Sequence, residues 1–105
     1  MRMERLDIPL PYSAAKRFRR YASLYDVDQC TIAKTAVTRY CKQIPPAMEL
    51  EENTEEGRER VFVSMPDTAM RLLELWSETT GISRRKLLGW AIQKLIKDDM
   101  EEREE

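Results

Sequence analysis

The feature that most constrains this chain is a short alternating stretch that ends in proline, Arg60-Val61-Phe62-Val63-Ser64-Met65-Pro66. The apolar residues Val61, Val63 and Met65 alternate with Arg60, Phe62 and Ser64. Alternation with a period of two residues is typical of a strand with one buried face. Pro66 ends such a strand and suits the first turn of a helix, where its missing N–H is not needed. A single strand leaves its backbone polar groups and one face without a partner, so the fold requires a second strand.

The chain supplies that second strand itself, because the pattern repeats at an offset of fifty-five residues. Arg5-Leu6-Asp7-Ile8-Pro9-Leu10-Pro11 matches Arg60–Pro66 position by position, and the apolar positions of two following helices match at the same offset. Few residues are identical, but the apolar pattern is kept through three elements, which indicates an internal repeat. We therefore expect the strands to pair antiparallel within one chain, in a mainly α fold with a short two-stranded antiparallel β-ribbon. The alternative is an exchange in which like strands pair between two chains.

The expected order of elements is β-α-α-linker-β-α-α. The divisions are a first repeat over 1–44, an acidic linker over 45–59, a second repeat over 60–97 and an acidic tail over 98–105. Helices are expected from about 12 to 24, 28 to 42, 67 to 80 and 83 to 97, with Asp28 and Ser83 as N-caps and Gly81 as a left-handed stop. We expect a flexible linker, in which Ala47-Met48-Glu49-Leu50 can add a helical turn, and a frayed tail.

The helices should bury one stripe each against the ribbon. The residues expected to face inward are Ala14, Phe18, Tyr21 and Ala22, then Ile32, Val37 and Tyr40, then Ala69, Leu72, Leu73 and Trp76, and finally Leu87, Leu88, Ala91, Ile92, Leu95 and Ile96. A solvated face is the simplest reading of the opposite side of the first helix, with phosphate contact as the alternative. That side carries Lys16, Arg17, Arg19 and Arg20.

Charge is distributed unevenly along a chain whose net charge is only −1. The four divisions carry +5, −5, +4 and −5 in order, so both repeats are basic and the acid lies in the linker and tail. A basic face on such a chain can still bind phosphate, because the local electrostatic field, and not the net charge of the chain, determines where an anion binds. No apolar run is long enough for a membrane span and no signal peptide is evident, so we expect a cytoplasmic protein.

The residues needed for catalysis or metal binding do not gather into any pattern. There is no histidine, and Cys30 and Cys41 are eleven residues apart on one expected helix. Two such thiols offer neither a metal set nor an activated nucleophile. We expect no enzyme, no cofactor, no metal and no small-molecule ligand.

The ordered set of strand, turn, helix, short turn and helix, found twice, resembles the ribbon-helix-helix DNA-binding family of the Arc and MetJ type. Arg60–Pro66 and Gly81-Ile82-Ser83 carry the likeness in the second repeat, and Arg5–Pro11 and Val27-Asp28 carry it in the first. The resemblance implies a β-ribbon that enters the major groove of double-stranded DNA, with second-helix N-termini that clamp phosphates. As a tandem repeat, the chain would be a pseudo-dimer by itself, and further self-association stays open.

Transfer by position assigns the base-facing residues Arg60, Phe62 and Ser64, and in the first repeat Arg5, Asp7 and Pro9. Arginine can hold guanine O6 and N7, serine can serve several bases, and phenylalanine can cover a thymine methyl group. Phe62 has the alternative of packing under a neighbouring segment. Asp7 either accepts from cytosine N4 or is repelled by the phosphate field.

The phosphate anchor implied by the resemblance lies at the start of the last helix. It comprises Ser83, Arg84, Arg85 and Lys86, with simple helix capping as the alternative. In the first repeat Asp28 stands at the matching place and would oppose an anion. The expected function is a nucleoid-associated transcriptional regulator, most simply a repressor. The competing interpretation is an antitoxin-like or scaffold interaction module of the same fold without specific DNA binding.

Overall fold

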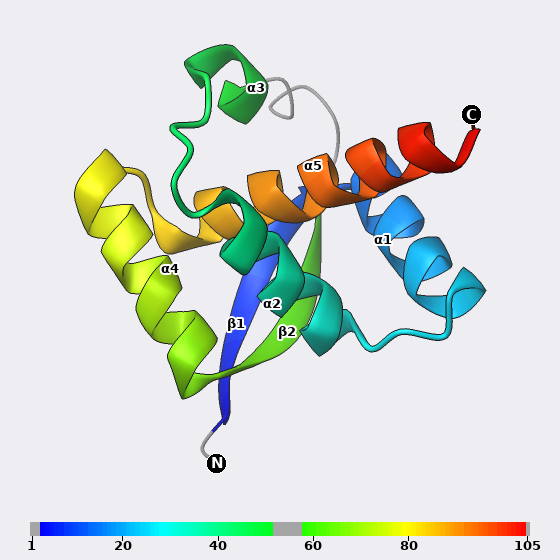
Figure 1. The fold of residues 1–105 in the computed structure, drawn as a ribbon, viewed down its shortest axis with the longest axis horizontal. Helices are drawn as coiled ribbons and strands as arrows, with labels where there is room; N and C mark the ends of the chain where they lie inside the picture. Colours follow the sequence, from blue (N-terminus) through cyan, green and yellow to red (C-terminus); the bar gives the residue numbers. More distant parts are fainter. Residues whose placement is uncertain (1–2, 52–57, 105) are drawn as a thin grey trace.

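The computed structural model describes residues 3–51 and 58–104, whose elements follow the expected order with one short helix added (Figure 1). In chain order they are β1 (Met3–Pro11), α1 (Tyr12–Leu24), α2 (Gln29–Tyr40), α3 (Ala47–Glu51), β2 (Arg58–Pro66), α4 (Asp67–Thr80) and α5 (Arg84–Glu104). The linker expected over 52–57 and the last tail residue lie outside the described residues. Within the described ranges, no helix has the length and apolar character that a membrane span requires.

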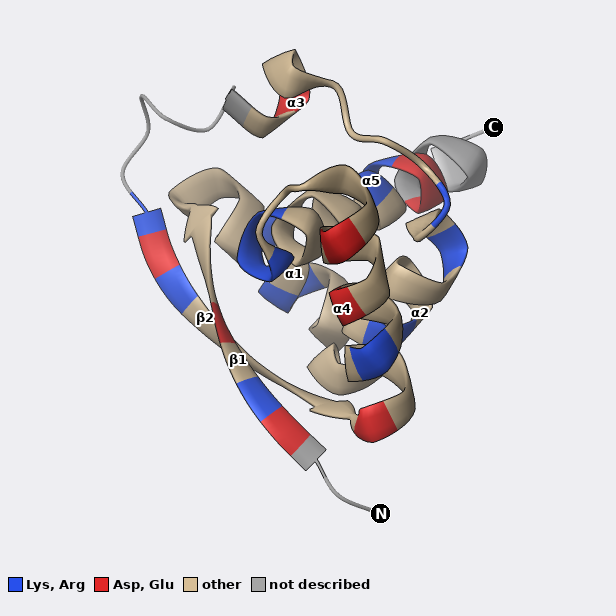
Figure 2. Ribbon diagram, turned by 90° about the vertical axis from the view of Figure 1, so that its left-hand side faces the viewer, with Lys and Arg blue, Asp and Glu red and all other residues tan. Residues whose placement is uncertain are grey.

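The two strands pair antiparallel within one chain, which confirms the pairing that the repeat predicts. Leu6 lies opposite Val63 and Ile8 opposite Val61, and all four side chains are buried. The ribbon lies along one side of the molecule, with the helices gathered on its other side (Figure 2). One face of the ribbon therefore belongs to the core, and the opposite face is left as surface.

The core lies between the inner face of the ribbon and the helices α2 and α5, which cross over it (Figure 1). Helix α2 packs on β2, α5 packs on β1, and the two helices pack against each other. The largest fully buried side chains include Phe18, Ile8, Leu10, Met65, Leu73, Leu87, Leu88, Ile92, Val37 and Val63. Helix α5 comes close to β1 at Gly89, where an added Cβ would lie 3.3 Å from Ile8 Cγ2. Glycine at this position thus allows the helix to rest directly on the strand.

The predicted bounds of α4 are confirmed at both ends. Gly81 adopts a left-handed conformation with φ of 75°, and its N–H donates to the Ser77 carbonyl at 2.8 Å. Ser83 caps α5 as expected, because its Oγ accepts the Lys86 N–H at 3.3 Å. The prediction for Asp28 is only half right: Asp28 stands at the N-cap position of α2, but its exposed side chain makes no capping hydrogen bond.

The expectation that Leu72 faces inward is wrong. Leu72 is 37% exposed, whereas Met70 is 3% exposed and takes the inward place. Successive helix residues are turned by about 100°, so Leu72 and Met70 lie on opposite edges of the stripe that contains Ala69, Leu73 and Trp76. The rotation of α4 against the core selects the Met70 edge. Tyr21 and Ala22 are only half-buried, and the other residues expected to face inward are buried.

The segments expected to be flexible are more ordered than the sequence predicts. Helix α2 ends at Tyr40, earlier than expected, but α5 continues through the expected tail to Glu104. The Tyr40 hydroxyl donates to Asp98 Oδ2 at 2.8 Å and the Tyr21 hydroxyl donates to Asp99 Oδ2 at 2.6 Å, so the acidic residues gain partners. Within the expected linker, residues 47–51 form α3, which confirms the suggested helical turn, and Arg58 and Glu59 belong to β2.

Candidate nucleic-acid interface

The outward face of the ribbon collects the side chains that the sequence assigns to base contact. Successive strand residues point to opposite faces, so burial of one set turns its neighbours outward. Arg5, Pro9, Arg60, Phe62 and Ser64 are exposed and Asp7 is half-buried. Basic and acidic residues follow one another along this ribbon (Figure 2). We call the surface formed by these six residues the ribbon face.

The two arginines of the ribbon face have different partners. The Arg5 guanidinium lies over the Phe62 ring, with Cζ 4.3 Å from the ring centroid. Arg60 instead approaches Asp7, with Nη1 3.7 Å from Oδ2. Phe62 remains 49% exposed beneath Arg5, so packing under a neighbouring segment does not account for it. A cation over an aromatic face keeps its edge N–H groups free to donate, whereas a carboxylate competes for them.

The start of α5 brings a second group of cations beside the ribbon face. Ser83, Arg85 and Lys86 are exposed, and Arg84 is half-buried. The Arg84 side chain contacts α4, with Nη1 3.4 Å from Glu74 Oε1 and 3.7 Å from Met70 Sδ. Arg85 reaches the ribbon, where Nη2 lies 2.9 Å from Asp7 Oδ1. The predicted base-facing and phosphate-facing groups thus form one continuous surface, which Asp7 joins.

An ion pair also ties the first helix to one end of the ribbon. Arg19 lies 2.8 Å from Glu59 Oε1 through Nη2 and donates from Nη1 to Oε2 at 2.9 Å. The hydrogen bond from Arg19 holds the pKa of Glu59 below its usual range, and the same bond raises the pKa of Arg19. Both side chains are exposed, so salt screens this pair and its contribution to stability is small. Arg19 is thereby engaged, whereas Lys16, Arg17 and Arg20 are exposed on the same helix.

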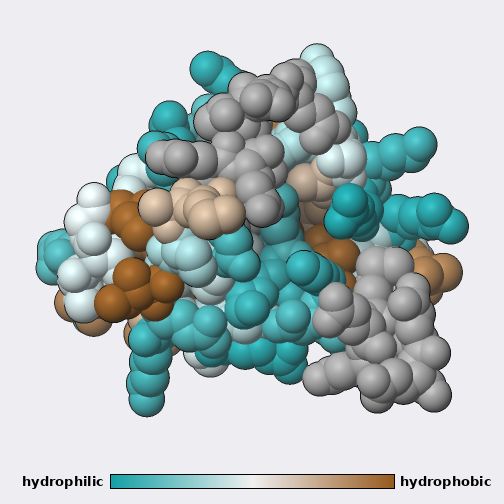
Figure 3. Space-filling model, turned by 90° about the horizontal axis from the view of Figure 1, so that it is seen from above, coloured by the Kyte–Doolittle hydropathy of each residue, from teal (hydrophilic) through white to brown (hydrophobic). Residues whose placement is uncertain are grey.

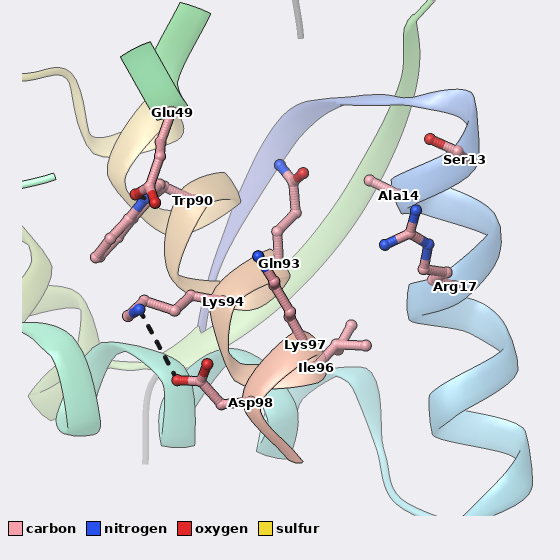
Figure 4. Close-up of a pocket in the computed structure, with 10 residues that line it drawn as sticks. All are labelled: Ser13, Ala14, Arg17, Glu49, Trp90, Gln93, Lys94, Ile96, Lys97 and Asp98. Carbon is pink, nitrogen blue, oxygen red and sulfur yellow. Dashed lines mark hydrogen bonds and ion pairs between the residues drawn. The ribbon is translucent and has the colours of Figure 1, made fainter. Parts of the chain in front are cut away.

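A groove of about 470 Å³ lies away from the ribbon face, between α1, α3 and α5. Glu49 reaches from α3 to α5, where it accepts the Trp90 indole N–H at 2.7 Å (Figure 4). Lys94 lies 3.9 Å from Asp98 and 5.7 Å from the centroids of Tyr40 and Trp90. The groove is lined by Ser13, Ala14, Arg17, Glu49, Trp90, Gln93, Lys94, Ile96, Lys97 and Asp98. Its lining carries both signs of charge, with Lys94 and Asp98 paired across it.

The sequence did not predict this groove, because it depends on α3 packing on α5. Trp90 is 8% exposed and was missing from the expected core. It lies three residues after Leu87 on the buried stripe, so helical periodicity contains the signal that places it inside. On the face of the molecule that bears α3, apolar residues gather in small patches separated by polar ones (Figure 3).

Within the described residues, no three histidine, cysteine, aspartate or glutamate side chains are close enough to hold a metal ion. Both cysteines are free and half-buried. Comparison of the chain with protein-family models, with curated proteins and with solved structures finds no match. The ribbon face and the start of α5 therefore have to be interpreted from their own chemistry.

Proposed function

We propose that this chain is a sequence-specific, double-stranded-DNA-binding regulator of transcription, built as a tandem member of the ribbon-helix-helix family. The observation that carries the proposal is an antiparallel ribbon packed on one face and free on the other, with Arg5 and Arg60 on the free face. The major groove of B-DNA is about 12 Å wide and admits a two-stranded ribbon. Arginine is the side chain that most often reads guanine there.

The register of the ribbon supports a pseudo-dimer made by one chain. In the repeat, Leu6 corresponds to Val61 and Val63 corresponds to Ile8. Leu6 pairs with Val63 and Val61 pairs with Ile8, so the two pairs are equivalent. Asp7 lies opposite Phe62, which is its own counterpart in the repeat. A pseudo-twofold axis through this central pair also exchanges the packing of α2 on β2 with that of α5 on β1. Homodimeric ribbon readers use true symmetry in this way to match two half-sites.

The cations at the start of α5 support phosphate contact beside the groove. Backbone N–H groups and the positive end of the helix dipole favour an anion at that position, and the exposed side chains of Lys86 and Arg85 add positive charge. Such contacts fix the position of a protein on the duplex without reading its sequence. In this proposal the ribbon face supplies specificity and the start of α5 supplies anchoring.

The proposal is tested by removing the two ribbon arginines and comparing the result with a matched removal elsewhere. A duplex selected from a random library is titrated by fluorescence anisotropy with wild type, with Arg5→Ala/Arg60→Ala, and with Lys42→Ala/Lys97→Ala. The control removes the same charge at exposed sites, and Lys97 is roughly 20 Å along α5 from Arg84 at 1.5 Å per residue. We expect the ribbon variant to lose about 1–3 kcal/mol per arginine and to relax base preference, whereas the control keeps its preference.

A second candidate function rests on the outer face of α4. Leu72 and Leu75 are 37% and 54% exposed and lie about one helical turn apart, which favours a protein-interaction module. The equivalent positions on α1 are Arg17 and Arg20, so this apolar pair belongs to one repeat only. If replacement of Arg60, Phe62 and Ser64 together by alanine leaves affinity and specificity for DNA unchanged, the ribbon is not the reading surface and this second function is favoured.

A further inference from the structure

Asp7 connects the two cationic parts of the candidate interface. Its Oδ1 lies 2.9 Å from Arg85 Nη2 and its Oδ2 lies 3.7 Å from Arg60 Nη1, so each oxygen faces one arginine. The Asp7 side chain is 21% exposed, whereas the side chains of Arg85 and Arg60 are 57% and 75% exposed. A carboxylate held between two exposed guanidinium groups stands where a DNA phosphate or base edge would otherwise engage them.

The other half of the ribbon has no such carboxylate. The residue equivalent to Asp7 is Phe62, and the residue equivalent to Arg85 is Cys30. Arg5, the equivalent of Arg60, lies on the Phe62 ring and keeps its charge. The ion pairs of Asp7 are therefore a feature of one half and not a requirement of the ribbon fold.

We propose that Asp7 is an intramolecular competitor of DNA, standing in for a phosphate at Arg85 and for a base edge at Arg60, and that it weakens binding to DNA of arbitrary sequence. This inference rests on the proposed function. Carboxylate and phosphate groups both match the guanidinium fork, so a phosphate that takes Arg85 replaces an existing ion pair and does not add one. DNA therefore gains less from Arg85 and Arg60 than from two free arginines.

The competition also makes binding conditional on the base at the centre of the site. When DNA displaces Asp7 from Arg85, the carboxylate is left facing the groove. Guanine and thymine present acceptor atoms there and repel it, whereas the amino groups of cytosine and adenine can donate to it. Every base pair presents one such amino group in the major groove, so the base that faces Asp7 decides. Asp7 thus penalises sites with guanine or thymine at that position and spares sites with cytosine or adenine there, which raises the ratio of specific to non-specific affinity.

The test measures binding to a non-specific duplex as a function of salt for wild type, Asp7→Asn and Glu4→Gln. Asp7→Asn keeps the shape and removes the charge; Glu4→Gln removes the same charge from an exposed ribbon position for which the described residues show no ion pair. One additional phosphate contact steepens the salt slope by about 0.9, which corresponds to about tenfold tighter binding at 0.1 M salt. We expect both changes for Asp7→Asn, while Glu4→Gln alters affinity by less than about twofold with an unchanged slope.

A double-mutant cycle assigns the effect to the ion pair. In an Arg85→Ala background, Asp7→Asn should tighten binding by clearly less than about tenfold, because the released cation is missing. Thermal unfolding of each variant verifies that the fold is retained.

Each outcome bears on the proposal separately from the proposed function. Tighter, more salt-dependent binding by Asp7→Asn that shrinks without Arg85 supports the competitor. If wild type binds duplex DNA and Asp7→Asn binds it equally or more weakly, the competitor is refuted while DNA binding stands; weaker binding would make Asp7 a positioning residue. If neither protein binds any duplex, both proposals fail.

Discussion

Two neighbouring leucines in α4 provide a direct test of how this helix faces the core. Leu73 is fully buried and Leu72 is 37% exposed, although hydrophobic periodicity places both on the inner stripe. Leu73→Ala and Leu72→Ala make the same chemical change in adjacent residues of one helix. The pair therefore isolates burial from helix propensity, which is the same in both variants.

The expected costs follow from the burial of each side chain. Leu73→Ala removes a packed side chain and leaves a cavity, which costs about 2–5 kcal/mol. Leu72→Ala removes a side chain at the edge of the core and should cost about 0.5–1 kcal/mol, near the range for surface changes. The difference of about 1–4 kcal/mol is a large part of the stability of a domain of this size.

Urea unfolding followed by tryptophan fluorescence measures this difference, because Trp76 and Trp90 are 2% and 8% exposed and should report loss of the core. With a slope of about 2 kcal/mol per molar urea, the midpoint of Leu73→Ala should lie roughly 0.5–2 M below that of Leu72→Ala. An unchanged slope confirms that both variants unfold from a comparably compact state. Midpoints that agree within about 0.3 M would refute the orientation of α4 and favour the sequence pattern, in which both leucines face inward.

Two further predictions concern a turn and a buried phenol. Gly81→Ala should lower the free energy of unfolding by about 1–2 kcal/mol, because φ is 75° and a residue with a Cβ is strained in this left-handed conformation. An added Cβ meets nothing within 4 Å, so a steric clash does not contribute. An unchanged melting temperature would contradict a left-handed requirement at this turn. Burial, followed by the hydrogen bond to Asp98, raises the pKa of Tyr40 above its ordinary value of 10.0. The protonated phenol therefore contributes fully to stability below pH 10.0, and this contribution is lost as the pH rises through the pKa of the folded state. Melting temperatures between about pH 8 and 11 should therefore fall more steeply for wild type than for Tyr40→Phe, and parallel curves would remove Tyr40 from the alkaline transition.

Local sequence determined the elements of this protein and the pairing of its strands. Alternation along Arg60–Pro66 specifies a strand, because a one-residue slip would turn its apolar set toward solvent. Pro66 and Gly81 specify where α4 begins and ends through their own backbone preferences, and both ends agree with the structure. The repeat then supplied the partner strand. The strand and helix signals act within a few residues of their origin, and the repeat is visible by comparing the sequence with itself, so both can be read without a tertiary structure.

Candidate site residues were located by the same reasoning, but their partners were not. Strand periodicity places Arg5, Phe62 and Arg60 on one face, and the structure agrees. Whether an arginine there meets an aromatic ring or a carboxylate depends on the register of two strands that are distant in sequence. The approach of Arg85 to Asp7 depends further on how α5 lies against β1, where Gly89 allows close contact.

Tertiary structure alone decided the remaining features, because each depends on a partner far along the chain. The expected tail is helical where Asp98 and Asp99 accept hydrogen bonds from Tyr40 and Tyr21, which lie 58 and 78 residues earlier in the chain. Helix α3 gains Trp90 as a partner for Glu49, forty-one residues away. An acidic segment looks flexible when its composition is considered alone, since composition records the cost of ordering it but not the hydrogen bonds that offset that cost.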